Sequence, residues 1–102
     1  MQPTDDQPDS RVFFALADAT RRRLLDRLYA RDGQRLGELS SDFAISRQAI
    51  SKHLDVLENA GLVTVRRSSG GTLHFLNRVP IRQVQSRWIA KFTQPQVRID
   101  CS

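Results

Sequence analysis

Residues 46–62 read SRQAISKHLDVLENAGL and contain two patterns at helical spacing. Four apolar residues predict one buried side of a helix: Ala49, Ile50, Leu54 and Leu57. Another side carries polar residues, of which only Asp55 is acidic: Arg47, Gln48, Ser51, Lys52 and Asp55. Such a face fits a major groove and can read base edges. The alternative is an ordinary amphipathic surface helix.

Both ends of this helix carry end signals. Ser46 can accept a hydrogen bond from an unpaired N–H of the first turn, as an N-cap. Gly61 suits the left-handed position after the last turn, and Leu62 would then touch Leu57. We therefore expect the helix to begin and end within this segment.

A short helix is expected just before it, over residues 36–43. Leu36, Leu39 and Phe43 point inward at helical spacing, and residues 44–46 form a tight connector. Two helices joined in this way make a helix-turn-helix. The turn lacks the glycine often found there, so Ala44 must adopt its geometry.

A β-hairpin is expected after Gly61, because the apolar period changes to two. Residues 63–66 and 72–76 alternate around the turn sequence Ser68-Ser69-Gly70-Gly71. A hairpin directly after a recognition helix is a wing. Its rim carries residues that can contact the DNA backbone or the minor groove: Arg66, Arg67 and Thr72.

The rest of the chain predicts three further helices. The first is capped by Ser10, and the second is capped by Asp18 and carries a core stripe that includes Tyr29. The last begins with Pro80 at its first position and ends before Pro95. Its expected stripe consists of Ile81, Val84, Trp88 and Phe92, with Ile89 alongside.

The expected fold is therefore mainly α with a small β-hairpin, a winged helix-turn-helix of five helices. We divide the chain into a flexible arm (1–9), the domain (10–93) and a mobile tail (94–102).

Three arginines, Arg21 to Arg23, stand in the first turn of the second helix, where the helix dipole disfavours cations. A nearby phosphate would offset this cost. The alternative is solvation together with a local pair of Arg23 with Asp26.

The charge distribution favours a polyanionic partner. The chain has 16 Lys and Arg against 11 Asp and Glu, and three of those acids lie within residues 1–10. Residues 62–99 hold seven bases and no acid. An Arg-rich, acid-free segment attracts DNA, and the alternatives are a solvated basic surface or an anionic membrane.

Several classes of protein find no support in the sequence. The 102 residues fit one domain. We expect no membrane span, because no apolar run is long enough, and no secretory signal is evident. Cys101 is the single cysteine, so no intramolecular disulfide can form. We expect the protein to be located in the cytoplasm. No set of residues is arranged for catalysis, and Gly70-Gly71 is a turn rather than a phosphate loop. We expect no enzyme and no cofactor.

The expected DNA contacts come from the long helix and the wing. Arg47, Gln48 and Ser51 would read bases, while Lys52, Arg66 and Arg67 would engage phosphates. Ser46, His53 and Thr72 complete the set, with packing against the domain as the alternative for His53.

The ordered motifs resemble the ArsR/SmtB family of bacterial repressors. They are ALADATRRRLL (15–25), LGEL (36–39), ISRQAISKHL (45–54) and LENAGLV (57–63). The resemblance covers residues 12 to 92. It implies a winged-helix homodimer that represses transcription from a roughly palindromic operator. In the family the first and last helices pair across the two-fold axis, which here implies an interface of Phe13, Phe14, Trp88, Ile89 and Phe92.

The chain departs from the metal-sensing members of the family. Where these have cysteines in the first helix of the helix-turn-helix, this chain has Leu39-Ser40-Ser41-Asp42. The last helix has no His or carboxylate among residues 82–87. Zinc and soft metals need Cys or His ligands in number, so we expect no metal at the usual sites. Two alternatives remain: a metal held by His53 or His74 with carboxylates across subunits, and a winged-helix module that binds a protein.

Overall fold

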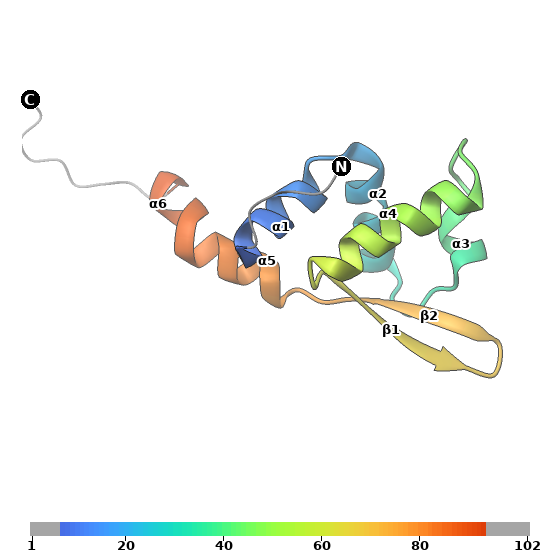
Figure 1. Cartoon of the computed structure of the whole chain (residues 1–102). Helices are drawn as coiled ribbons and strands as arrows, with labels where there is room; N and C mark the ends of the chain where they lie inside the picture. The colour runs from blue at the N-terminus through green and yellow to red at the C-terminus, as the bar shows by residue number, and fades with distance from the viewer. Residues whose placement is uncertain (1–6, 94–102) are drawn as a thin grey trace, which may run out of the picture.

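The computed structural model describes residues 7–93 as a mainly helical chain with one antiparallel hairpin (Figure 1). The elements are α1 (Pro8–Leu16), α2 (Ala19–Ala30), α3 (Leu36–Ser40), α4 (Arg47–Asn59), β1 (Val63–Ser68), β2 (Gly71–Leu76), α5 (Val79–Val84), η1 (Gln85–Ile89) and α6 (Ala90–Thr93). This order confirms the expected winged helix-turn-helix. The expected tail, most of the arm, Pro95 and Cys101 lie outside the described residues.

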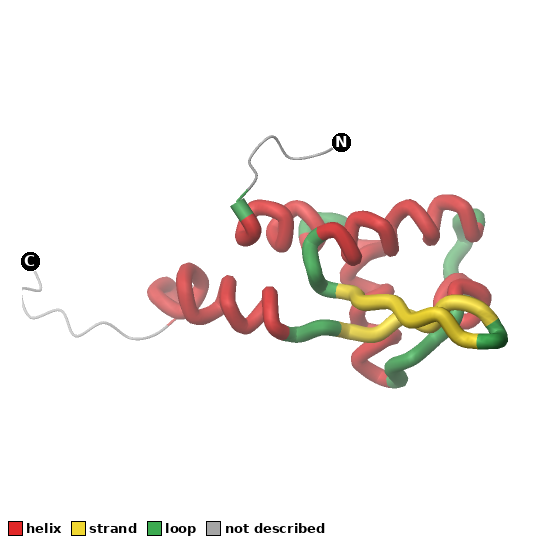
Figure 2. Tube along the Cα trace, turned by 60° about the horizontal axis from the view of Figure 1, so that its bottom comes forward, coloured by secondary structure: helices red, strands yellow, loops and turns green. Residues whose placement is uncertain are grey.

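The core lies where α1, α2, α3 and α4 meet the base of the wing. Its buried side chains come from all of these elements and from α5: Val12, Ala15, Leu24, Leu25, Leu28, Leu39, Ile50, Leu54, Leu57, Leu62, Val63 and Val84. Three of the four apolar residues expected on α4 are among them, and Ala49 is half-buried. The wing and α3 lie at one end of the molecule, and the last helix projects from the other (Figure 2).

The expected helix ends are confirmed. The Asp18 carboxylate accepts from the backbone N–H of Arg21 at 3.1 Å, and Ser46 Oγ accepts from that of Ala49 at 3.1 Å. Gly61 has φ +79°, and the N–H of Leu62 donates to the carbonyl of Leu57 at 2.9 Å. This is the predicted Schellman ending of α4.

Three local predictions are wrong. The first helix begins at Pro8 with Gln7 as its N-cap residue, so Ser10 is not the cap and residues 8 and 9 belong to the helix rather than to the arm. The helix α3 ends at Ser40, which leaves Phe43 in the connector. Tyr29 is 72% exposed and does not belong to the core.

The last helix is not a continuous α-helix. It begins at Val79, one residue before Pro80, and Gln85–Ile89 form a π turn in which the Ala90 N–H bonds to the Gln85 carbonyl. A π turn brings residues five apart onto one side. Val84 and Ile89 are five apart and both pack on the core, so the expected stripe is split and Trp88 is left outside.

Candidate nucleic-acid interface

The polar side of α4 is exposed, as a DNA-reading helix requires. Arg47, Gln48 and Lys52 are exposed, and Ser51 is half-buried. The hydroxyl of Ser46 is engaged in capping the helix. Because Gln48 and Lys52 point away from the core, the first two turns of α4 are free to meet a partner.

The wing and α4 enclose a groove of about 510 Å³. Arg67 pairs with Thr72 in the hairpin, and both line this groove together with Ser51 of α4. Arg66 lies on the opposite side of the hairpin, where its Cζ is 5.2 Å from the centre of the Phe75 ring. Successive residues of a strand point to opposite faces, so the two arginines cannot contact one partner from the same side.

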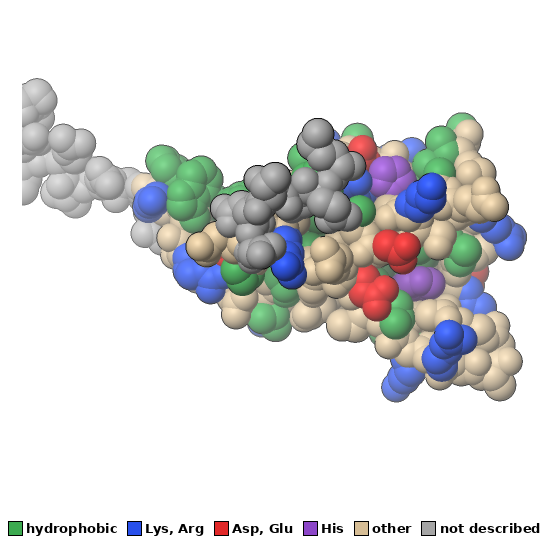
Figure 3. Space-filling view, viewed as in Figure 1, with side chains coloured by type: hydrophobic (Ala, Val, Ile, Leu, Met, Phe, Trp, Pro, Cys, Tyr) green, Lys and Arg blue, Asp and Glu red, His purple; other side chains and the backbone are tan. Residues whose placement is uncertain are grey.

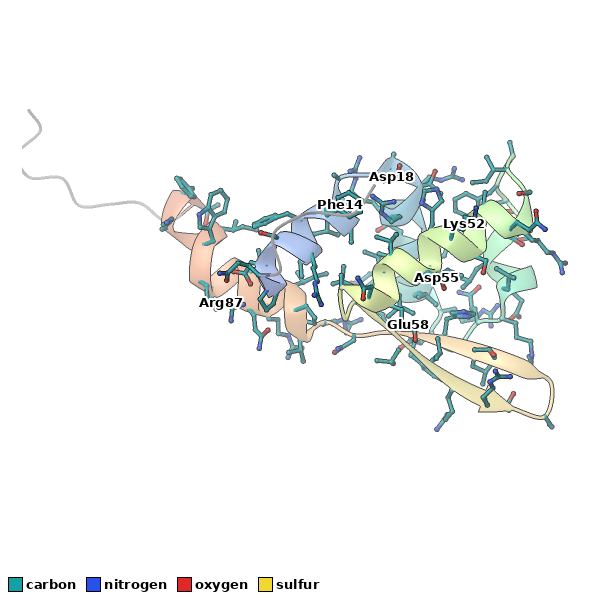
Figure 4. The ribbon with its side chains drawn as sticks, viewed as in Figure 1. Phe14, Asp18, Lys52, Asp55, Glu58 and Arg87 are labelled. Carbon is teal, nitrogen blue, oxygen red and sulfur yellow. The ribbon has the colours of Figure 1, made fainter. Side chains whose placement is uncertain are left out.

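Charge is unevenly distributed along the groove. Asp55 and Glu58 line its wall in the second half of α4, whereas Lys52 lies in the first half (Figure 4). In the space-filling view, acidic side chains cover the middle of α4 and basic side chains lie over the wing (Figure 3). A polyanion is therefore attracted to the beginning of α4 and the wing, and repelled from the inner wall.

His53 does not share the exposed face. Its Nδ1 lies 3.2 Å from Nη1 of Arg21 and 3.8 Å from the Asp18 carboxylate, and the side chain is 24% exposed. This is the packing alternative. Burial raises the pKa of the Asp18 carboxyl, but the Arg21 N–H and the charges of His53 and Arg21 outweigh it, so the pKa lies below its ordinary value.

The three arginines at the start of α2 have separate roles. Arg21 is 9% exposed, and its guanidinium donates to the carbonyls of Phe14 and Ala15 at the end of α1. Arg23 lies over the ring of Phe43, 4.3 Å from its centre. The expected local pair of Arg23 with Asp26 is not among the ion pairs of residues 7–93.

Residues 16–66 match the family model described as a helix-turn-helix domain. The chain is 43% identical over 84 residues to an uncharacterized HTH-type transcriptional regulator, YuzN of Bacillus subtilis, covering 76% of this chain and 91% of that protein. It is 32% identical to the transcriptional repressor SdpR of the same species, covering 79% and 88%. A crystal structure of an ArsR family transcriptional regulator superposes with a TM-score of 0.77 at 25% identity, covering 90% and 93%. The chain belongs to the ArsR family of helix-turn-helix transcriptional regulators. It is a DNA-binding transcriptional regulator, and its family is not one of enzymes.

This ArsR family regulator carries an exposed aromatic surface at the end remote from the wing. The Trp88 ring lies 5.4 Å from that of Phe13 and 4.8 Å from that of Phe92, centre to centre. Their exposed fractions are 46%, 37% and 66% for Trp88, Phe13 and Phe92. Of the other two expected interface residues, Ile89 packs on the core and Phe14 lies beneath the Arg21 guanidinium.

An ion pair joins the two segments that carry this aromatic surface. Arg87 of η1 pairs with Asp9 of α1, and Figure 4 shows Arg87 beside α1. The hydrogen bond that the Arg87 guanidinium donates to this carboxylate raises the pKa of Arg87. The pair holds the last helix against the first.

His74 is buried and its ring lies against the chain rather than in solvent. Its Nδ1 is 2.9 Å from the carbonyl of Gln34, which also pairs with His74 through the backbone. Within residues 7–93 no three His, Cys, Asp or Glu side chains are grouped so that they could hold a metal ion. None of the helices in that range has the length and apolar character needed to cross a bilayer.

Two features of this interface were missed from the sequence. Arg35 lines the groove from the start of α3, and Arg21 connects the end of α1 to His53 of α4. The side-chain contacts of these two residues do not follow from a local pattern, because their partners lie 6 to 35 residues away along the chain. The signals present in the sequence were Gly70 in the wing loop, for Arg35, and the run Arg21 to Arg23, for Arg21.

Proposed function

We propose that this regulator is a homodimeric repressor that binds a roughly palindromic operator through α4 and the wing. The observation that carries the proposal is the separation of two exposed surfaces. The polar side of α4 and the wing lie at one end, and the aromatic surface lies at the other. A two-fold axis at the aromatic surface would leave both reading helices outward. The similarity to SdpR, a transcriptional repressor, supports repression.

The proposed roles on DNA follow the chemistry of each side chain. Arg47, Gln48 and Ser51 contact base edges from the first turns of α4, and Lys52 contacts a phosphate. Arg67 and Thr72, on the groove side of the wing, contact the DNA strand that α4 also contacts. Arg66 contacts the backbone from the other side. Ser46 caps α4 and lies at the edge of the proposed DNA contact. His53 packs against Arg21 of α2 and so supports α4 from the side that faces the domain.

The proposed dimer is formed by α1 and the last helix of each subunit. Phe13, Trp88 and Phe92 would be covered by the same residues of the partner. Phe14, under the Arg21 guanidinium, and Ile89, on the core, would support the same two helices from within their own subunit. Large exposed aromatic side chains in contact with one another mark an interaction surface. We place the regulator in the cytoplasm with the DNA that it binds.

The test begins with selection of bound fragments from the source genome to obtain an operator. Arg47→Ala should weaken operator binding by about 1–3 kcal/mol and relax sequence preference, measured by fluorescence anisotropy. Arg82→Ala, a matched loss of one exposed charge on α5, should leave sequence preference unchanged. Wild-type affinity in Arg47→Ala would refute the proposed reading face.

Two outcomes would point to other functions. A protein-binding module would retard no duplex and would show affinity that varies little with salt. A metal-responsive repressor would take up zinc, nickel or cadmium stoichiometrically in equilibrium dialysis. We expect neither outcome, since the exposed face of α4 suits DNA and the usual metal ligands are replaced.

A further inference from the structure

Arg35, just before α3, is tied to the tip of the wing. Its Nε donates to the carbonyl of Gly70 at 2.8 Å, across 35 residues of the chain. The preceding residue, Gln34, pairs with His74 of β2, so the backbone on this side is fixed. The guanidinium of Arg35 is therefore held at the loop that joins β1 to β2.

The space for this guanidinium explains the glycine at position 70. A Cβ built on Gly70 would lie 3.1 Å from Cζ and 3.2 Å from Nε of Arg35. The backbone of Gly70 does not itself require glycine, because the positive-φ glycines of the described residues are Gly33, Gly61 and Gly71. Gly70 thus leaves room for the guanidinium of Arg35 in its observed position.

The charge of Arg35 is available to a ligand. Arg35 is exposed, and none of the ion pairs among residues 7–93 involves it. The nearby Glu38 carboxylate pairs with Arg31 at 3.1 Å and accepts from the backbone N–H of Arg35. Those two hydrogen bonds, the backbone bond first, lower the pKa of Glu38, and the charges of Arg31 and Arg35 lower it further.

Two other arginines stand on the same side of the molecule. Arg67 lines the groove with Arg35 and Gly70. The guanidinium of Arg47 lies against α3: its Nη2 is 3.2 Å from the point that a Cβ would occupy on Gly37. Gly37 itself lines the groove. The acids that line the groove, Asp55 and Glu58, lie on α4. An anion is therefore attracted to the end of the groove at the wing tip, where Arg35 and Arg67 lie.

We propose that Arg35 is a DNA-contact residue that binds a backbone phosphate and holds the wing tip in position to meet the same strand. Its Nε is engaged by Gly70, and the forked guanidinium leaves its Nη groups for phosphate oxygens. The role rests on the proposed DNA-binding surface of α4 and the wing. It adds a contact from α3 that connects the helix-turn-helix to the wing.

The test uses a labelled mixed-sequence duplex of about three helical turns, since a phosphate contact needs no operator. Fluorescence anisotropy is measured for the full-length protein between about 50 and 200 mM salt. In Arg35→Ala, the slope of log affinity against log salt should fall by about 0.9 for each phosphate that the variant no longer neutralises. That corresponds to about an eightfold loss of affinity per phosphate at 0.1 M relative to about 1 M salt. Arg82→Ala, which removes the same charge from α5, should keep the wild-type slope.

A second variant tests the positioning role without removing the charge. In Gly70→Ala the new methyl group moves the Arg35 guanidinium away from its place at the wing tip while the charge stays, so affinity should fall by less than in Arg35→Ala. Arg35→Ala should then lose less affinity in the Gly70→Ala background than in the wild-type background, because the two residues act through one contact. Ser69→Ala, in the same loop and without this contact, should bind as wild type. Circular dichroism melts confirm that each variant is folded.

The outcomes separate this inference from the proposed function. A wild-type slope in folded Arg35→Ala would refute the phosphate contact, while Arg47→Ala could still show the reading face. Wild-type affinity in Gly70→Ala would refute the positioning role. If the wild-type protein bound no duplex at any salt, the proposed DNA surface itself would be wrong, and Arg35 with it.

Discussion

Replacing Arg21 by methionine should destabilise the fold through the end of α1. Arg21 is 9% exposed, and its Nε and Nη2 donate to the carbonyls of Ala15 and Phe14 at 2.8 and 3.0 Å. The last carbonyls of a helix have no partner inside the helix, so this guanidinium caps α1. Methionine keeps the apolar stem and removes both of these hydrogen bonds, together with the 3.2 Å contact between Nη1 and Nδ1 of His53.

The size of the effect follows from what each carbonyl retains. The Phe14 carbonyl still accepts from the N–H of Ala17 at 3.2 Å, whereas the Ala15 carbonyl loses its bond to the guanidinium. A hydrogen bond to a charged group contributes about 1.5–3 kcal/mol, and an unpaired buried carbonyl costs about 1–3 kcal/mol. Removing a buried charge offsets part of this loss, because the guanidinium no longer has to be desolvated on folding. We expect a loss of about 2–4 kcal/mol in the free energy of unfolding.

The assay is urea unfolding followed by circular dichroism at one fixed protein concentration, because dimerisation would add to apparent stability. Arg22→Met is the matched control, since Arg22 also donates to a carbonyl of this helix end, that of Leu16, but at an exposed site. It should cost less than about 1 kcal/mol. Equal losses in the two variants would refute the argument from burial. Arg21→Lys should fall between wild type and Arg21→Met, because an ammonium cannot reproduce the fork.

Three further predictions concern the dimer, the end of α4 and pH. Trp88→Ala should yield monomer in sedimentation, while Tyr29→Ala, which truncates an exposed aromatic outside that surface, should leave the dimer; a persistent dimer in Trp88→Ala would place the interface elsewhere. Gly61→Ala should cost about 1–2 kcal/mol in urea unfolding, because φ is +79°, and an unchanged midpoint would argue against strain there. The pKa of Asp18 is lowered in the fold, so the stability it contributes is present above its ordinary pKa of about 4 and is lost as pH falls through the folded value. Asp18→Asn should therefore lose less stability than wild type between about pH 5 and pH 2; parallel pH profiles would contradict this.

The exposed polar face of α4 could be predicted because its pattern is local. Gln48 and Lys52 are four residues apart, so helical periodicity alone places them together and away from Ile50 and Leu54. The wing was predictable for the same reason, from its alternation and the turn at Ser69-Gly70. The relation of Arg66 to Arg67 also follows from that alternation, which places them on opposite faces of β1.

The burial of charged and polar side chains could not be predicted. Arg21 was expected in solvent or near a phosphate, yet it is 9% exposed, and no sequence pattern indicated that His74 is buried to the same extent. Their partners, the end of α1 and the backbone of Gln34, are set by how the elements pack. No spacing within α2 or β2 encodes those contacts.

The sequence alone determined the order of the elements, the caps at Asp18 and Ser46, and the glycine ending at Gly61. The caps and the glycine ending depend on hydrogen bonds between residues within five positions of one another, and the order of the elements depends on the local apolar period and the turn residues, so local chemistry is enough. Three features come from the packing of distant elements: Arg21 reaches His53, Arg35 reaches the wing tip, and the last helix widens to a π turn. The two arginine contacts join elements that are distant in the chain, and the π turn aligns Val84 and Ile89 toward a core built by other helices. Packing sets these features, and the residues nearby in sequence do not.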